Sequence, residues 1–396
     1  MRKPAFGVHP DVFKLGLVSF LTDLSSEMIF SVFAVFFTTV AGATAALLGL
    51  VEGLADLAAA SLNYLSGWLS DRTGKRKILT FAGYGFSTLA KLILLISSTV
   101  TGLGLFRVIE RLGKSFRGPP RDAWLASVAD PRTRGYAFGV HKALDKSGAV
   151  LGPLAAYGLL SWLGDTASTY RILFVVALVP AVLAVIVLGL VKEVPGTPHE
   201  HENMVQTWNV LSPDFKRYLI TSAIFSLAYF SFSFLLLRAY RMGFAVKDVV
   251  LLYALFNISC VVASPVLGKL GDHVGRGRMI LLGYTTYFLM CLGFVLATTR
   301  WQVIGLFVVF GVFYAIDEVQ SKAFIADLEL NRRGSAMGVY NLVTGMVYLP
   351  ASLIAGAWWA LNPDSAFLFA AGVSAIALAV FLALRPDRRQ VGRRPA

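Results

Sequence analysis

Long apolar segments recur along the chain at the spacing expected of membrane-spanning helices. Each runs for about 20 residues or more, the length at which an α-helix crosses a hydrocarbon core about 30 Å thick. Short polar loops separate neighbouring segments. The predicted spans are 12–40, 45–69, 78–98, 101–124, 136–163, 168–191, 214–241, 245–271, 279–299, 301–327, 334–360 and 364–385. The pattern therefore predicts an all-α membrane protein with twelve transmembrane helices.

One longer polar stretch divides these spans into two sets of six. Residues 192–213 are polar and rich in Pro, His and Glu, which is typical of a solvated linker. We expect an N-terminal bundle over 1–191, a cytoplasmic linker over 192–213 and a C-terminal bundle over 214–396.

The composition favours the same class of protein. Hydrophobic residues make up 56% of the 396 residues and charged residues only 15%, whereas soluble proteins carry about 25% charged residues. The net charge of +13 lies in short clusters between apolar segments, which argues against the solvated basic face needed to bind nucleic acid. Basic loops instead orient membrane proteins, and their positions here place both termini and the linker in the cytoplasm.

No motif for an enzyme or a cofactor is found in the sequence. Cys260 and Cys291 lie inside apolar segments, where small buried hydrophobes are expected rather than disulfides or metal ligands. The GKS triplet at 113–115 lacks the first glycine of a phosphate-binding loop, and no zinc, haem or hydrolase spacing occurs. We predict no enzymatic activity, no cofactor and no metal site.

The two halves of the sequence resemble each other. GWLSDRTGKRK at 67–77 recurs as GKLGDHVGRGR at 268–278, 201 residues later. ASVADPRTRGYAFGV at 126–140 recurs as IADLELNRRGSAMGV at 325–339, 199 residues later. An internal duplication of this kind, with a cavity between the halves, is a recurrent plan among secondary transporters.

The first of these repeats resembles the signature loop of the major facilitator superfamily. Gly67, Asp71, Arg72 and Gly74 have the spacing of that loop and lie between the second and third predicted helices, and Asp272 belongs to the second copy. The resemblance covers essentially the whole chain. It implies two pseudo-symmetric six-helix bundles, a monomer in a prokaryotic inner membrane, and a role for these five residues in a cytoplasmic gate. The alternative is a basic loop that only sets the orientation of the chain.

The fifth predicted helix resembles the antiporter motif of the same superfamily. Gly139, Gly148 and Gly152-Pro153 match the motif, but the two glycines that usually close it are absent. The resemblance implies that Gly148, Gly152 and Pro153 take part in gating. Small residues at this spacing also let two helices approach closely, and this structural alternative remains open.

The fourth predicted helix carries a stripe of charge. At 3.6 residues per turn, six side chains fall within roughly 120° of one another: Arg107, Glu110, Arg111, Lys114, Arg117 and Arg121. Charges inside a membrane face the protein interior or an aqueous cavity, and the superfamily resemblance places this helix beside the cavity. The predicted substrate ligands are Arg107, Arg111, Lys114 and Arg117, and Arg121 is assigned to the gate. Alternatively, the stripe is mainly a network of ion pairs.

Carboxylates near this stripe are candidates for proton coupling. Asp23 and Glu27 share one face of the first helix and are the preferred pair. The full set of candidates is Asp23, Glu27, Glu110, His141, Asp145, Asp317 and Glu318. Since an unpaired buried charge is unfavourable, some of these groups must pair with the cations of the stripe.

The C-terminal half offers a different chemistry. Its first helix, SLAYFSFSFLLLRAY at 226–240, is rich in aromatic and serine residues, and Tyr229 and Arg238 are further candidates for substrate binding. A cavity with one cationic and one aromatic wall suits an amphiphilic or aromatic anion, or an anionic metal chelate.

These features favour a secondary active transporter that works by alternating access. The preferred function is proton-coupled export of a small anionic or amphiphilic molecule, with protons and membrane lipid as the other partners. One alternative is proton-coupled uptake of a small organic anion. Another, from a different class, is a non-transporting membrane receptor or sensor, although no soluble signalling domain is present.

Overall fold

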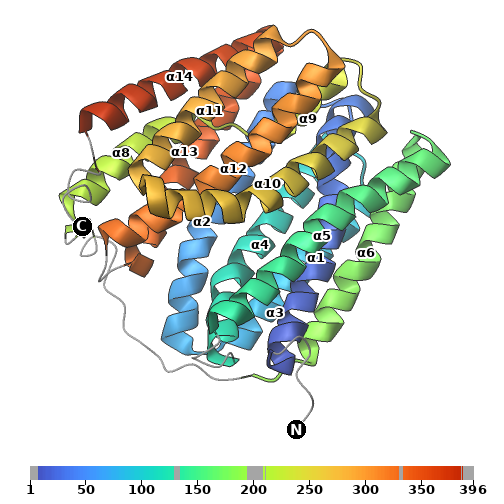
Figure 1. Ribbon diagram of the computed structural model, residues 1–396. Helices are drawn as coiled ribbons and strands as arrows, with labels where there is room; N and C mark the ends of the chain where they lie inside the picture. Colours follow the sequence, from blue (N-terminus) through green and yellow to red (C-terminus); the bar gives the residue numbers. More distant parts are fainter. Residues whose placement is uncertain are drawn as a thin grey trace. The chain divides into compact units, whose positions relative to one another are not determined.

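The computed structural model describes residues 8–128, 134–193, 208–209, 211–329, 333–384 and 386. The main elements of the described residues are long helices, labelled in Figure 1. They are α1 (Pro10–Val35) with the π-helical turn η1 (Phe36–Val40), α2 (Ala45–Thr73), α3 (Arg76–Ile96), α4 (Val100–Val128), α5 (Arg134–Leu163), α6 (Ala167–Gly189), α8 (Pro213–Ala228), α9 (Ser233–Arg241), α10 (Val246–Val274), α11 (Arg276–Leu296), α12 (Arg300–Leu328), α13 (Arg333–Leu361) and α14 (Pro363–Leu384).

The predicted membrane-spanning segments are confirmed as helices. Each corresponds to one helix or to two consecutive helical segments, and the ends differ from the predicted ends by at most four residues. Within the described residues, ten helical segments are long and apolar enough to cross a membrane. α4 and α5 are not among these ten, and they carry many of the charged side chains described below.

The seventh predicted span is interrupted, which the sequence pattern did not predict. α8 ends at Ala228 and α9 begins at Ser233, so residues 229–232 are not helical. Ser231 supports the new start, because its hydroxyl accepts a hydrogen bond from the backbone of Ser233 at 3.3 Å. Serine favours such a position at a helix start over the helix interior. The apolar pattern continues through the interruption and therefore hides it.

The described residues form two compact units. Unit 1 comprises those within Met1–Thr44, Leu54–His201 and Leu235–Ala254, and unit 2 those within Ala45–Gly53, Glu202–Phe234 and Leu255–Ala396. In unit 1, α1 packs against α5 and α6, and α3 packs against α4. In unit 2, α8 packs against α13 and α14, and α11 packs against α12 and α14. The first turns of α2 therefore group with unit 2.

The first turns of α1 and α8 are built alike. α1 begins at Pro10 and its Asp11 pairs with Lys14 at 2.8 Å. α8 begins at Pro213, and its acidic second residue pairs with Arg217 at 3.1 Å. Proline is favoured in the first helical turn, where its missing N–H needs no partner. These matches relate α1 to α8 by a shift of 203 residues.

A hydrogen bond between two helices is duplicated as well. Ser19 Oγ lies 3.2 Å from Tyr84 Oη in unit 1, and Ser222 Oγ lies 3.4 Å from Tyr284 Oη in unit 2. The first members differ by the same 203 residues, and the tyrosines by 200. The shared bond gives a register in which positions of α1 correspond to positions of α8 and the segment that follows it, and positions of α3 correspond to positions of α11.

Candidate functional site

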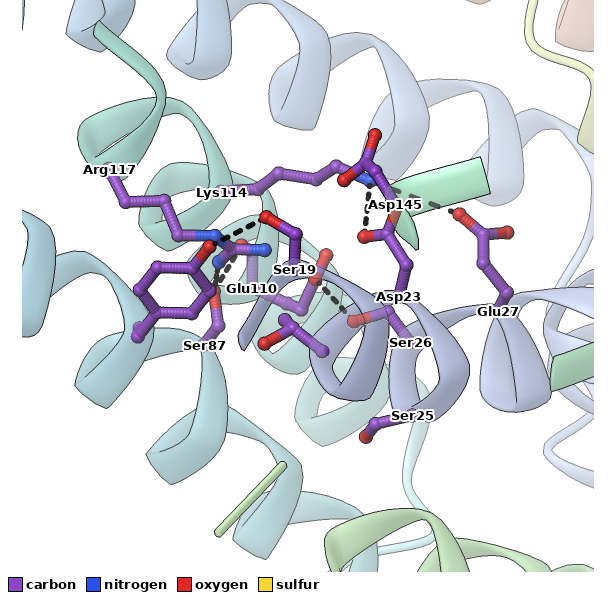
Figure 2. Close-up of polar contacts among 12 residues, drawn as sticks. Ser19, Asp23, Ser25, Ser26, Glu27, Ser87, Glu110, Lys114, Arg117 and Asp145 are labelled. Carbon is purple, nitrogen blue, oxygen red and sulfur yellow. Dashed lines mark hydrogen bonds and ion pairs between the residues drawn. The ribbon is translucent and has the colours of Figure 1, made fainter. Parts of the chain in front are cut away.

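Unit 1 contains a cluster of polar side chains from five helices, which we call the central polar cluster. Part of it is drawn in Figure 2. Its members are Ser19, Asp23, Ser25, Ser26 and Glu27 on α1; Asp56 on α2; Tyr84, Ser87 and Lys91 on α3; Arg107, Glu110, Arg111, Lys114, Arg117, Arg121 and Asp122 on α4; and His141 and Asp145 on α5. Spacings of three and four residues place most of the α1 and α4 members on shared helix faces. The cluster contains as many carboxylates as Lys and Arg side chains.

Lys114 lies between the two preferred coupling carboxylates. Its Nζ is 3.6 Å from Asp23 Oδ1 and 3.9 Å from Glu27 Oε1, and Figure 2 shows Asp145 beside the same ammonium group. The side chains of Asp23 and Glu27 are 11% and 10% exposed, whereas that of Lys114 is 34% exposed. Both carboxylates are thus shielded, while the lysine can be reached from outside the cluster.

Arg111 and Arg107 each have a defined partner. Arg111 Nη2 lies 2.9 Å from Asp56 Oδ1, within the range of a charge-assisted hydrogen bond. The guanidinium of Arg107 lies 4.3 Å from the ring centre of Phe30, a cation–π contact, and its Nη1 is 3.8 Å from Glu110 Oε2. These contacts agree with the alternative in which the stripe is largely a network of pairs.

Arg117 is enclosed by α3. It is 2% exposed, its guanidinium lies 4.3 Å from the ring centre of Tyr84, and its Nη1 donates to Ser87 Oγ at 2.6 Å. Gly83 makes this approach possible, because a Cβ there would lie 2.6 Å from the Cβ of Arg117. Burial of this kind makes Arg117 a poor candidate for direct contact with substrate in the state described.

Arg121, assigned to the gate from the sequence, belongs to the same cluster. Its Nη1 donates to Ser19 Oγ at 3.0 Å, and its Nη2 is 2.9 Å from Asp122 Oδ1. His141 Nε2 lies 3.0 Å from the same Ser19 hydroxyl. On α5, Asp145 Oδ2 lies 3.4 Å from the exposed Lys142.

Sequence reasoning missed Lys91. It is 1% exposed, and its Nζ donates to Ser25 Oγ at 2.7 Å and to Ser26 Oγ at 3.1 Å. Ser26 Oγ in turn donates to Glu110 Oε1 at 3.2 Å. A signal was available, because Lys91 is the one charged residue between positions 78 and 96, and a charge within a membrane span marks a functional site by default.

Two hydroxyl groups that approach glutamates were also missed. The Tyr253 hydroxyl on α10, within unit 1, donates a hydrogen bond to Glu27 Oε2. Within unit 2, Ser233 Oγ donates to Glu52 Oε1 at 3.1 Å. Nothing in the local sequence around Tyr253 or Ser233 indicates these partners, since they depend on how distant helices pack.

The glycines of the predicted antiporter motif pack against α1. A Cβ at Gly148 would lie 2.4 Å from the carbonyl oxygen of Phe20, and one at Gly152 would lie 2.7 Å from that of Leu24. The latter would also lie 3.0 Å from the Cβ of Glu27. Close helix approach is therefore observed, and gating by these glycines, and by Pro153 within α5, remains a prediction.

The remaining candidates for substrate binding and proton coupling lie in unit 2 or on a helix that contributes no residue to the central polar cluster. Tyr229 lies at the end of α8 in unit 2, with its ring centre 5.7 Å from that of Tyr348. Also in unit 2, Asp317 accepts a hydrogen bond from Ser321 at 3.3 Å, and Glu318 pairs with Lys322. Arg238 is half-buried and belongs to unit 1.

The signature loop forms a tight turn between α2 and α3. Gly74 has φ of +66°, a conformation that favours glycine, and Gly275 occupies the equivalent turn with φ of +100°. A Cβ at Gly67 would lie 3.4 Å from Pro119 Cβ, so α2 and α4 approach closely there. The guanidinium of Arg72 lies 5.0 Å from the ring centre of Trp68. The predicted gating carboxylates, those of Asp71 and Asp272, lie outside the described side chains.

A family model described as the Major Facilitator Superfamily matches residues 15–316 and 239–396. The chain belongs to the Major Facilitator Superfamily. It is 35% identical over 366 residues to an uncharacterised MFS-type transporter of Methanocaldococcus jannaschii, with 91% of each chain covered. It is 25% identical over 330 residues to Multidrug resistance protein 1 of Bacillus subtilis, covering 81% of this chain and 82% of that protein.

Solved structures of the superfamily share this fold. The nucleoside transporter NupG matches with a TM-score of 0.77 at 12% identity, covering 95% of this chain and 99% of that one. A bacterial homologue of the human lysosomal transporter Spinster matches with a TM-score of 0.76 at 15% identity, covering 96% and 97%. The predicted superfamily fold is thereby confirmed. The protein is a multi-pass membrane transporter and not an enzyme.

Proposed function

We propose that this transporter exports a small amphiphilic molecule in exchange for protons. In this proposal it works by alternating access, as a monomer in a prokaryotic inner membrane with both termini in the cytoplasm. The observation that carries the proposal is the position of Lys114 between Asp23 and Glu27. These three charged groups lie close together, and the two carboxylates can each take up a proton. Protonation and substrate binding can therefore compete at this site.

The direction of coupling depends on which group the substrate uses. A substrate whose cationic or hydrogen-bond donor group binds Asp23 or Glu27 competes with protons for the same carboxylates, and competition of this kind gives antiport. A substrate anion that binds Lys114 instead requires a carboxylate to release the lysine by taking up a proton. Proton and anion then bind together, which gives symport, and this is the alternative function of anion uptake.

Three features favour export of an amphiphilic molecule. The positive charge of the α4 stripe is offset by partners such as Asp56, which leaves a weaker positive field than the stripe alone would give. The name of the Bacillus subtilis relative, Multidrug resistance protein 1, points in the same direction. The glycines of α5 that resemble the antiporter motif lend further support.

The test uses purified protein in proteoliposomes with an imposed pH gradient. A fluorescent lipophilic cation and an aromatic carboxylate are followed separately, with the gradient in each direction. We expect the lipophilic cation to move against the proton flow, and we expect Lys114→Met and Glu27→Gln to abolish the effect of the gradient. Lys247→Met, at an exposed position outside the cluster, is the control. Movement of the carboxylate together with protons would establish the uptake alternative, and no proton-dependent flux of either probe would refute both.

A further inference from the structure

The buried ammonium group of Lys91 sits among oxygen atoms that can only accept hydrogen bonds from it. A serine hydroxyl has one proton to donate. Ser25 donates its proton to the carbonyl oxygen of Ala177 on α6, and Ser26 donates its proton to Glu110. Both hydroxyls therefore direct lone pairs toward Lys91 Nζ, at 2.7 and 3.1 Å. The surroundings have the polarity of a site for a small cation.

Glu110 is linked to this site through Ser26. Its side chain is fully buried, and Oε1 accepts the hydrogen bond from Ser26 while Oε2 is 3.8 Å from Arg107. A buried carboxylate requires a compensating cation close by. Among the described residues, Lys91 makes no direct ion pair with a carboxylate, so Ser26 links its charge to that of Glu110.

We propose that Lys91 is a tethered cation, which permanently occupies a cation site formed by Ser25, Ser26 and Glu110. Glu110 is then neutralised by the chain itself and needs neither a proton nor a free metal ion. This assignment goes beyond the proposed export function and does not depend on it. It also removes Glu110 from the candidates for proton exchange during transport, among which Asp23 and Glu27 remain the preferred pair.

The internal duplication shows that the fold does not require this charged site. The duplicated serine–tyrosine bond and the repeated loop after α4 set the register between the two halves. In this register, each residue of the Lys91 site has an apolar or aromatic counterpart in unit 2. The counterparts of Ser25, Ser26, Lys91 and Glu110 are Ala228, Tyr229, Cys291 and Val309. Cys291 is fully buried, like Lys91, so the same place in the fold accepts a small uncharged side chain.

The experiment removes the tether and offers a free cation in its place. Thermal unfolding of Lys91→Ala is measured in sodium chloride, in methylammonium chloride and in choline chloride at equal ionic strength. We expect Lys91→Ala to unfold at a lower temperature than wild type, and sodium or methylammonium to raise its midpoint by about 3 °C or more over choline. Wild type and Lys91→Ala/Glu110→Gln should not respond. Cys291→Ala is the matched control in unit 2.

Charge pairing is tested by a second pair of variants. Lys91→Met removes the buried ammonium group linked to Glu110 through Ser26 and leaves only the longer 3.8 Å contact with Arg107. We expect Lys91→Met/Glu110→Gln to be more stable than Lys91→Met alone. Equal stability of the single and double variants would overturn the proposal, as would an equal response of wild type and Lys91→Ala to the small cations. These measurements need no substrate. A failure of proton-driven flux would therefore refute the export proposal and leave this one standing.

Discussion

The hydroxyl group of Tyr253 on α10 donates a hydrogen bond to Glu27, the carboxylate that Lys114 faces from α4 at 3.9 Å. One carboxylate is thus shared by a phenol and an ammonium group from two other helices. Any change in the charge of Glu27 alters its attraction for both. The position of α10 is thereby linked to the protonation of a residue on α1.

Loss of this hydroxyl should weaken both folding and transport. Tyr253→Phe keeps the ring and removes the donor, and a hydrogen bond to a charged group contributes about 1.5–3 kcal/mol. We expect a loss of stability of that order and a several-fold slower transport rate, measured by thermal unfolding and by flux in proteoliposomes. In a Glu27→Gln background the same change should have a much smaller effect. Independent, additive effects of the two substitutions would contradict the shared hydrogen bond.

The pairing of Arg111 with Asp56 separates two interpretations of the α4 stripe. If the pair is structural, Arg111→Gln, Asp56→Asn and the double variant should have similar transport kinetics, with KM close to wild type. The pair is partly exposed, so we expect each single change to lower stability by only about 1 kcal/mol. A rise in KM that occurs with Arg111→Gln but not with Asp56→Asn would instead identify Arg111 as a substrate ligand.

The contact of α5 with α1 beside Glu27 should tolerate no added side chain. A Cβ at Gly152 would lie 2.7 Å from the carbonyl oxygen of Leu24, so Gly152→Ala forces the two helices apart. We expect a loss of about 1–3 kcal/mol in stability and a marked loss of transport. Gly158→Ala, on the same helix with no atom within 4 Å of the added Cβ, is the matched control. Equal behaviour of the two variants would show that the close approach is unimportant.

The end of α6 is held by side chains from other helices. Lys77 Nζ donates to the carbonyl oxygens of Gly189 at 3.1 Å and Val191 at 2.7 Å, and Trp124 Nε1 donates to that of Lys192 at 3.2 Å. A cation at a helix C-terminus is stabilising. We expect Lys77→Met to lower stability by about 1–2 kcal/mol and to speed amide hydrogen exchange at residues 188–192.

The control for this prediction is Lys75→Met, because Lys75 is exposed and lies in the same basic run. If all the basic residues served only to orient the chain or to contact lipid, the two variants would behave alike. A difference confined to Lys77 would assign it a structural role at the start of the segment that connects the two sequence halves.

Helix positions were predictable from sequence because the length of an apolar segment reflects the thickness of the membrane. The charged face of α4 was predictable too, because the spacing of Arg107, Lys114 and Arg121 places all three side chains on the same side of the helix. Their partners were not predictable. Arg111 pairs with Asp56, and Lys114 lies near two carboxylates of α1. These pairings depend on how each helix is rotated about its own axis, and the local sequence pattern does not indicate that rotation.

The interruption between α8 and α9 shows the same limit. The side chains of residues 229–232 are as apolar as those around them, and only the backbone hydrogen bonds reveal the break. Lys91 is a different case, because its isolation in an apolar segment was visible. A single lysine is a weaker sequence signal than the clustered charges of α4.

The duplicated serine–tyrosine hydrogen bond allows one half of the protein to serve as a reference for the other. It joins Ser19 to Tyr84 in one half and Ser222 to Tyr284 in the other. Each half shows how the shared helical fold behaves when the side chains specific to the other half are absent. Exchanging residues between matched positions, one at a time and in both directions, would measure the free energy of each buried charge against a reference in the same protein, the same solvent and the same membrane.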